Sequence, residues 1–397
     1  MSVRKKGFLT VAMAAVLVAL AGCNKRNTSG SKNLSSGIAM EQSGLITVHD
    51  QTKSAVASAL PRVMNGGGLI GVLGGARVKC LVGGTHEVLL PMPQLTESQI
   101  PVCYAVVTIP QGAVKEIRLY KREEANMAVR LQFQGNQDEE VQIEWSSIIL
   151  VVDTSVAPND TVSKPYLQET ACVQSNAEQV RTLAEKLWPA NGRTDAYAAN
   201  IQKFIQNMKQ EKQPRSMDAL GILESGCNWI CTGNANLATA LLRSKKVPAR
   251  SIAVIPSTGQ KLEMHRIVEC FDAGQWHSFD PSFLQRDIPL KPWQNIIMAT
   301  TTIADEEIAM KPRMGSSLGC PYGQELEILT GKVTLWGTDF FWTQAVPIAE
   351  FKASDEAITL AKAQWHRFLE TGEQSQGQLN AAAAANSAEL QEALKMN

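Results

Sequence analysis

A cysteine, a histidine and an aspartate follow one another along the chain in an order that suits nucleophilic catalysis. Cys231 precedes a run of small and apolar residues, and His265 and Asp280 lie on two later apolar segments. A thiolate can attack an amide carbonyl, an imidazole can take up the thiol proton, and a carboxylate can hold the imidazole in the useful tautomer. These residue types in this order predict acyl transfer at peptide or amide bonds.

The segment after Cys231 has the composition of a buried helix. From residue 234 to residue 243 almost every side chain is small or apolar, which is typical of a helix covered on all sides. Lys245 and Pro248 would end it, since basic residues suit a last turn and proline cannot continue a helix. Cys231 then falls at or just before the first turn, where the helix dipole lowers the pKa of a thiol.

Three apolar segments after this helix are predicted to be strands, at residues 251–256, 262–271 and 275–280. If the last two are antiparallel neighbours, His265 and Asp280 lie side by side. Several helices are predicted ahead of Cys231. The order of helices, then the cysteine helix, then strands is that of an α+β fold.

The same residues resemble the transglutaminase-like superfamily, whose core is papain-like. Its first motif runs Cys-x-x-x-Ala-x-Leu, Leu-Leu-Arg and Pro-Ala-Arg, and its second runs His-x-aromatic-x-Glu, Trp and Asp-Pro. The resemblance extends over about residues 165–285, and Ile267 departs from it where the family usually has tryptophan. The matching residues are Cys231, Ala235, Leu237, Leu241, Leu242, Arg243, Pro248, Ala249 and Arg250 in the first motif, and His265, Glu269, Trp276, Asp280 and Pro281 in the second.

The resemblance implies a nucleophile at Cys231, a base at His265 and an orienting carboxylate at Asp280, with no cofactor. The family contains proteases and amidases, which pass the acyl group to water, and transglutaminases, which pass it to an amine. Both activities stay open, with peptide hydrolysis favoured. The alternative is a non-catalytic envelope lipoprotein that uses the core as a binding module.

Two residues compete for these roles. Cys227 lies four residues before Cys231 but lacks the Ala-x-Leu spacing, and His277 lies on the segment that ends at Asp280. Alternation along that segment would direct His277 to the face opposite Asp280. The pair Cys227 and Cys231 does not have the usual zinc spacing, and the chain has no His-x-x-x-His pair, so no metal site is predicted.

The first residues have the pattern of a targeting segment. A basic start is followed by an apolar run too short for a membrane span, which ends in Leu-Ala-Gly-Cys at Cys23. This ending resembles a bacterial lipobox, which implies cleavage before Cys23 and lipidation of its sulfur. The expected location is the bacterial cell envelope, at the outer membrane if the cell is Gram-negative. An ordinary secretory signal with a chance cysteine is the alternative.

The rest of the chain divides by pattern. Val129, Leu131 and Phe133 alternate with polar neighbours, as do Val141, Ile143 and Trp145, and this period of two predicts half-buried antiparallel strands, in a sandwich, with a hairpin at Gly135–Asn136. The glycine-rich run at 66–75 lacks a phosphate-loop ending, so close backbone packing or a flexible connection is expected there. The expected divisions are a signal peptide at 1–22, a flexible tether at 23–44, an N-terminal β domain at 45–160, a transglutaminase-like core with trailing strands at 161–350, and a C-terminal helix with an Ala/Gln-rich tail at 351–397.

Charge excludes one class of partner. The 397 residues hold 38 basic and 38 acidic side chains, and without residues 1–22 the count becomes 35 basic and 38 acidic. No basic stripe is present, which argues against binding of nucleic acid. The expected partners are a peptide or protein substrate and a membrane, reached through the lipid on Cys23.

Overall fold

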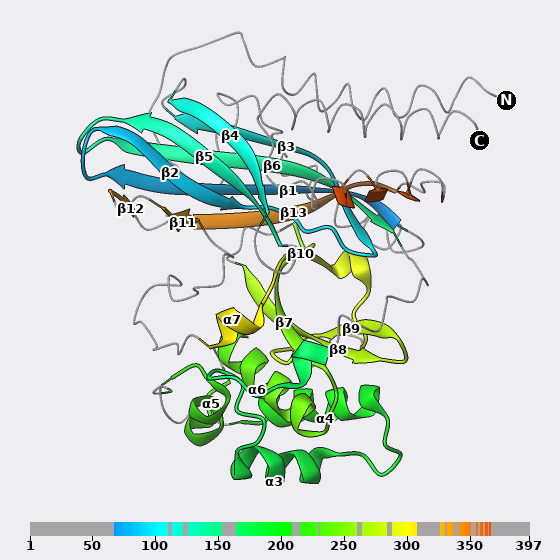
Figure 1. Ribbon diagram of the computed structural model, residues 1–397. Coiled ribbons are helices and arrows are strands. Elements are labelled where there is room, and N and C mark those ends of the chain that lie inside the picture. Colours follow the sequence, from blue (N-terminus) through cyan, green and yellow to red (C-terminus); the bar gives the residue numbers. More distant parts are fainter. Residues whose placement is uncertain are drawn as a thin grey trace, which may run out of the picture.

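The structure is a computed structural model with a mixed α+β fold. It places a β-rich part at one end, a layer of helices at the other, and a four-stranded sheet between them (Figure 1). This confirms the predicted fold class. The lipobox cysteine and the tether lie outside the described residues. The structure describes residues 67–109, 113–121, 126–152, 164–208, 214, 216–228, 231–259, 264–283, 288–307, 326–329, 332–336 and 341–350, and single positions between 355 and 366.

The β-rich part consists of two antiparallel sheets. One has the strand order β12–β1–β6–β3, with β13 also paired to β1, and the other has the order β11–β2–β5–β4. One apolar cluster draws residues from both sheets, so they pack face to face as a sandwich. The strands are β1 (Gly67–Cys80), β2 (Gly84–Pro91), β3 (Gln99–Ile109), β4 (Val114–Lys121), β5 (Met127–Gly135), β6 (Glu140–Val152), β11 (Glu327–Ile328), β12 (Val333–Leu335) and β13 (Phe341–Glu350).

The alternating side chains of β5 and β6 meet in that core. Phe133 and Trp145 are fully buried, as the period of two predicts. The hairpin expected at Gly135–Asn136 is wrong, because β5 pairs with β2 and β4 whereas β6 pairs with β1 and β3. The period of two identifies the buried face of each strand. It does not identify the strand that receives the hydrogen bonds.

The glycine-rich run lies in β1, and aromatic rings of the neighbouring strands pack directly against its backbone. A Cβ atom on Gly74 would lie 2.2 Å from the indole of Trp145 on the neighbouring β6, and one on Gly75 would lie 2.4 Å from the indole of Trp342 on β13. Such distances are far inside van der Waals contact, so the glycines make room for two large aromatic rings.

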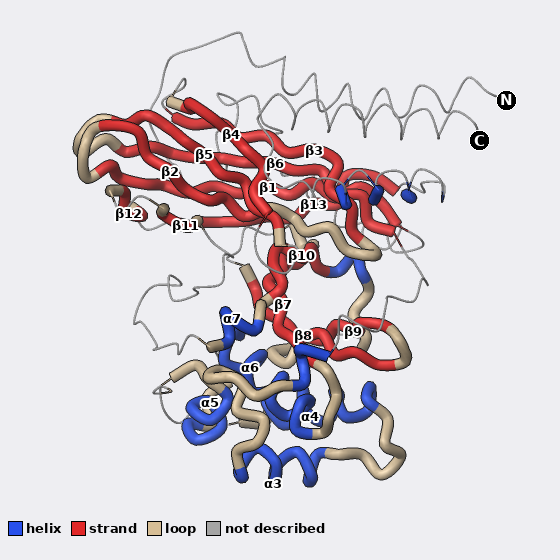
Figure 2. Tube along the Cα trace, in the orientation of Figure 1, coloured by secondary structure: helices blue, strands red, loops and turns tan. Residues whose placement is uncertain are grey.

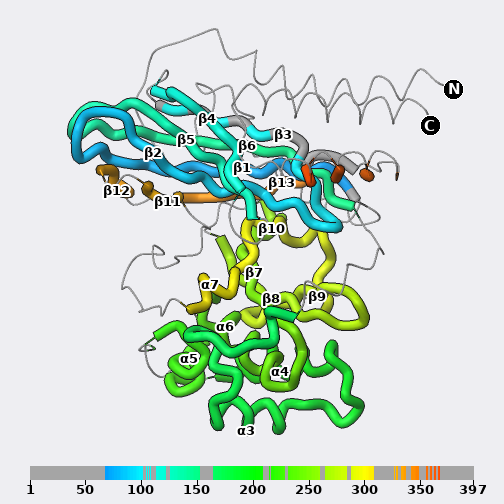
Figure 3. The backbone as a smooth tube through the Cα atoms, in the orientation of Figure 1, coloured from blue at the N-terminus to red at the C-terminus, as the bar shows by residue number. Residues whose placement is uncertain are grey.

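The last described strands return to the first sheets. β13 and β12 pair with β1, and β11 pairs with β2, so the last described strands lie beside the first ones (Figure 3). Trp365 belongs to the sandwich core as well. By position in the sequence these strands are expected to trail the catalytic core. They pair with the sandwich instead, because β1 and β2 offer hydrogen-bonding edges that strands far along the chain can fill.

The remaining elements form a helical layer on a separate sheet (Figure 2). This sheet is antiparallel, with the order β10–β7–β8–β9. Its strands are β7 (Ala249–Pro256), β8 (His265–Asp272), β9 (Gln275–Phe279) and β10 (Asn295–Thr300); the helices are α3 (Glu178–Leu187), α4 (Thr194–Gln206), α5 (Ala219–Ser225), α6 (Cys231–Ser244) and α7 (Ile303–Glu306), with short 3-10 turns η4 (Lys164–Leu167) and η5 (Pro292–Gln294).

Helix α6 is the centre of this layer. Its residues from Thr232 to Arg243 are all buried, and its leucines share one apolar cluster with α3, α4, α5 and β8. The prediction of a central, buried helix after Cys231 is confirmed.

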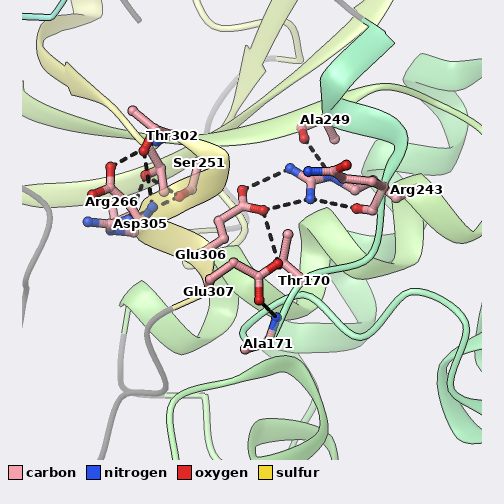
Figure 4. A network of polar contacts seen from close by, with 12 residues as sticks. Thr170, Ala171, Arg243, Ala249, Ser251, Arg266, Thr302, Asp305, Glu306 and Glu307 are labelled. Carbon is pink, nitrogen blue, oxygen red and sulfur yellow. Dashed lines mark hydrogen bonds and ion pairs between the residues drawn. The ribbon is translucent and has the colours of Figure 1, made fainter. Parts of the chain in front are cut away.

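A buried ion pair fixes the far end of α6 (Figure 4). The guanidinium of Arg243 donates to both carboxylate oxygens of Glu306 in α7, at 2.6 and 2.8 Å, and to the Ala249 carbonyl oxygen at 2.9 Å. Thr170 donates a further hydrogen bond to Glu306, at 3.1 Å. Loss of either charged partner would leave the other buried and uncompensated, which is strongly destabilising. The pair therefore holds α6 against β7 and α7.

The sandwich and the core sheet meet along β10. The Gln99 side-chain amide donates to the Ile297 carbonyl at 2.8 Å and accepts from the Ile297 N–H at 2.9 Å. Asn126 makes the same pair of bonds with Thr300, both at 2.8 Å. These amides bond the edge of β10 that β7 leaves open, as a neighbouring strand would.

Candidate active site

Cys231 is the first residue of α6, and its residue surface is partly exposed. The helix behind it is buried on all faces, so its N-terminus has a fixed position at the edge of the core. The backbone N–H groups of a first turn have no partner within the helix and carry the positive end of its dipole. A thiol at this position is therefore favoured to ionise.

His265 is the first residue of β8 and bonds Asp280. Its Nε2 lies 2.8 Å from Oδ2 of Asp280, whose side chain is fully buried. The β8–β9 ladder pairs Val268 with Phe279, so Asp280 lies just past the ladder and reaches diagonally to His265. The two residues lie side by side, as the antiparallel arrangement of the two segments predicts.

A second hydrogen bond joins the His265 ring to the thiol of Cys231. Because Nε2 is engaged by Asp280, Nδ1 is the ring nitrogen left available to the thiol. The three residues singled out in the sequence therefore form a continuous chain of contacts, with the imidazole between sulfur and carboxylate.

The pKa values of the thiol and the imidazole move in opposite directions. Burial of the imidazole opposes its protonation, but hydrogen bonds and Coulombic attraction from Asp280 and Cys231 outweigh burial and raise the pKa of His265 to about 9. Burial likewise opposes ionisation of the thiol, but the hydrogen bond and charge of His265 outweigh it and lower the pKa of Cys231. Both shifts favour the charged forms, a thiolate beside an imidazolium, over the neutral pair.

The backbone N–H of Arg266 also donates to the Cys231 sulfur and adds to this lowering of the pKa. The Arg266 side chain is buried and donates to the hydroxyls of Ser251, at 3.0 Å, and Thr301, at 2.8 Å. The sequence analysis missed this residue. A backbone donor has no signature in residue types, and only the position next to His265 could have pointed to it.

The turn that carries Asp280 is held by α4. Gln202 donates from one side-chain nitrogen to the carbonyl oxygens of Asp280 and Phe283, both at 2.8 Å, and Gln206 donates to Pro281 at 3.1 Å. Gln202 is buried. The sequence analysis missed both glutamines, although their spacing of four residues places them on one face of the helix.

Asn234 joins the nucleophile helix to this turn and to the segment before Cys231. Its Nδ2 donates to the Asn228 carbonyl at 2.7 Å and to the Ser282 hydroxyl at 3.0 Å, and the residue is fully buried. The backbone N–H of Ser282 donates in turn to Oδ1 of Asp280 at 2.8 Å. One amide therefore connects the two segments that bring the thiol and the carboxylate to His265.

The rival residues lie elsewhere. Cys227 is fully buried in the segment before α6, outside the first turn. His277 pairs with Cys270 in the β8–β9 ladder, five residues along β8 from His265. Burial raises the pKa of Cys270 to about 12, so this thiol stays protonated.

An oxyanion formed at Cys231 would need hydrogen-bond donors close to the sulfur. The Asn228 side-chain amide donates to the Gln206 carbonyl at 3.3 Å, so it is engaged with α4. Trp229 lies outside the described residues. The Cys231 N–H, at the start of α6, stays the candidate. In the described part of the chain, no group of three or more His, Cys, Asp or Glu side chains could hold a metal ion.

Comparisons with known proteins agree with the motif resemblance. Residues 181–281 match the model of the transglutaminase-like superfamily, a span that includes Cys231, His265 and Asp280. No curated protein matches the chain. Among solved structures, a proposed cysteine protease from Cytophaga hutchinsonii aligns with a TM-score of 0.47 and 16% identity, over 71% of this chain and 98% of that chain. That likeness is too distant to carry an argument about activity.

The charge arrangement predicts how alkylation of Cys231 depends on pH. In the native protein the thiolate should persist at neutral pH, because the imidazolium beside it keeps its proton up to about pH 9. In His265→Ala burial still raises the pKa of the thiol and the opposing imidazolium is gone, so at pH 7 the thiol should be ionised to no more than the about 3% of an ordinary cysteine. We expect alkylation at pH 7 to slow roughly tenfold or more, with the difference shrinking as the pH rises above about 9 and the thiol of the variant ionises.

His277→Ala is the matched control and should leave the alkylation profile unchanged. The measurement is the rate of iodoacetamide labelling from pH 5 to 10, mapped to Cys231 by mass spectrometry. A profile shifted by His277→Ala and unmoved by His265→Ala would contradict the assignment of the imidazole.

The Asn234 contacts predict an energetic coupling across the site. Asn234→Ala leaves the partly buried Asn228 carbonyl and Ser282 hydroxyl without this donor, which should lower the free energy of unfolding by about 1–3 kcal/mol. Ser282→Ala should cost less, because it removes one of the two bonds. In a double-mutant cycle measured by urea unfolding, we expect a coupling of about 0.5–1.5 kcal/mol. Strict additivity would show that the bond between the two side chains contributes nothing.

Proposed function

Starting from a transglutaminase-like core at residues 181–281, we propose that this protein is a thiol acyl-transfer enzyme acting on peptide or amide bonds. Cys231 is the proposed nucleophile, His265 the general base and acid, and Asp280 the residue that orients the imidazole. The observation that carries the proposal is the His265 ring bonded at once to the Cys231 thiol and to the buried Asp280 carboxylate. This is the relation of nucleophile, base and orienter that activates a thiol.

In the first half of the proposed reaction the Cys231 thiolate attacks the substrate carbonyl carbon. A bond forms between sulfur and carbon, and the carbonyl oxygen takes up negative charge, which the N–H of Cys231 at the helix start can stabilise. The carbon–nitrogen bond then breaks. The His265 imidazolium gives its proton to the leaving amine, and an acyl-enzyme remains.

In the second half the neutral imidazole removes a proton from the incoming nucleophile. Water gives a carboxylic acid, and a primary amine gives a new amide; in both cases the thiolate and the imidazolium are restored. Asp280 holds the ring through Nε2, which leaves Nδ1 for the sulfur. We propose peptide hydrolysis as the main reaction, with transamidation as the competing outcome to be tested.

The nucleophile assignment predicts different results for two cysteines four residues apart. Cys231→Ser should keep the fold and lose acyl transfer, because serine has no accessible anion at neutral pH and the dipole and imidazolium cannot supply one. Cys227→Ser should keep most of the activity, because Cys227 lies in the preceding segment, beyond the reach of the first-turn dipole.

The measurement is covalent trapping with an electrophilic peptide, followed by mass mapping of the adduct. An adduct on Cys227 with Cys231 unmodified would overturn the nucleophile. A folded protein that labels at Cys231 but turns over no peptide or amine would favour the non-catalytic binding module instead.

We also propose that the protein is exported and held on a membrane by a lipid on Cys23. The support is the sequence pattern of residues 1–23 alone. In the described part of the chain no helix is long and apolar enough to cross a membrane.

Replacing Cys23 with Ser should therefore release the protein from the membrane fraction and block maturation of the signal segment. Cell fractionation and the mass of the mature N-terminus test this. Unchanged processing together with unchanged membrane association would contradict the lipid anchor.

A further inference from the structure

An exposed aromatic side chain lies directly beside the proposed base. The ring of Phe283 is centred 5.4 Å from the ring of His265, at an interplanar angle of 57°. The residue nevertheless keeps 51% of its surface exposed. The ring therefore lies against the imidazole, and about half of the residue's surface is open to solvent.

Phe283 does not belong to a loosely attached segment. Its carbonyl oxygen accepts a hydrogen bond from the buried Gln202, which also binds the Asp280 carbonyl with the same nitrogen. Within the turn, the Ser282 N–H bonds the Asp280 carboxylate. The bonds that position Asp280 therefore also position Phe283, and the exposed ring has a defined place relative to His265.

Exposure of a large apolar side chain at this place is unusual for the molecule. The other large apolar side chains that the described residues leave exposed all belong to the sandwich part: Leu81, Val82, Leu329 and Trp336. In the transglutaminase-like part, the described residues expose one, Phe283. An aromatic ring held open to solvent beside a reacting group is suited to cover an apolar group of a ligand.

We propose that Phe283 is a specificity-determining residue, and that it selects substrates with an apolar side chain on the amine side of the bond that is broken. The inference rests on the proposed function.

The proposed mechanism indicates which side of the scissile bond lies near Phe283. His265 must reach the leaving nitrogen to protonate it, so a group that contacts the imidazole borders the part of the substrate that leaves as the amine. The thiolate, in contrast, borders the acyl part. An apolar residue that follows the scissile bond would therefore lie against the Phe283 ring and remove apolar surface from water on both partners.

The test uses a peptide library whose members are randomised at the residue after the scissile bond, with cleavage read by mass spectrometry. The native protein should cleave before Leu, Ile, Val and Phe with kcat/KM roughly tenfold above that before Ser or Asp. Phe283→Ser should remove most of this preference and Phe283→Leu should keep it. Leu329→Ser, which changes an exposed apolar residue of the sandwich part, should leave it intact.

Two outcomes would overturn the inference. One is a native protein without preference at this position. The other is a Phe283→Ser variant that loses kcat/KM equally for all peptides, since that result would assign the ring only to shielding His265 from water.

A second measurement separates this inference from the proposed function. The rate of Cys231 labelling by N-benzyl iodoacetamide, relative to iodoacetamide, needs no turnover. The benzyl reagent should gain severalfold over the small one in the native protein and lose that gain in Phe283→Ser. If the native protein shows this gain but cleaves no peptide, the proposed function is contradicted and the role of Phe283 in binding an apolar group is kept. If the gain is absent, the role of Phe283 is contradicted.

Discussion

A helix buried on every face determines the rest of the transglutaminase-like core. The buried polar side chains Arg243 and Asn234 of helix α6 need partners inside the protein, since an unsatisfied buried group is costly. Near one end of the helix Arg243 forms an ion pair with Glu306, and near the other Asn234 donates hydrogen bonds to Asn228 and Ser282. These partners come from segments far apart in the sequence. The need to satisfy one helix therefore assembles β7, α7 and the Asp280 turn around it.

The same constraint explains why the thiol and the imidazole have unusual pKa values in a site without a metal ligand set among the described residues. Each group alone would be driven toward its neutral form by burial. Together they favour the charged pair, because the fully buried Asp280 carboxylate adds a negative charge on the far side of the ring. The reactivity proposed for Cys231 thus depends on how firmly Asp280 is held, and Gln202 and Ser282 hold it by its carbonyl and its carboxylate.

Local pattern was enough to find the parts of this molecule whose signal lies within one segment. The run after Cys231 predicted a buried helix because burial on all faces leaves little room for charge. The period of two predicted the buried faces of β5 and β6. Motif spacing predicted that Cys231, His265 and Asp280 act together. The structure places His265 beside both Cys231 and Asp280, and the catalytic roles of the three residues stay predictions.

Contacts between distant segments could not be found in this way. Gln202 reaches a carbonyl 78 residues along the chain, and the bond from Arg266 to Cys231 uses a backbone group that every residue but proline has. The pairing of β13 with β1 spans almost the whole described chain, and many apolar segments would suit that edge equally. Pairing partners and backbone donors depend on the assembled fold, and the residue types alone do not encode them.

The hydrogen bonds that side-chain amides make along β10 bear on aggregation. An open strand edge is a template on which other chains can add strands and form aggregates. Here Gln99 and Asn126 occupy that edge with side chains of the sandwich, so the edge is closed within one molecule. A core fragment cut free of the sandwich would uncover these backbone groups and invite strand addition by its own copies. The sandwich therefore protects the core sheet from strand addition at this edge.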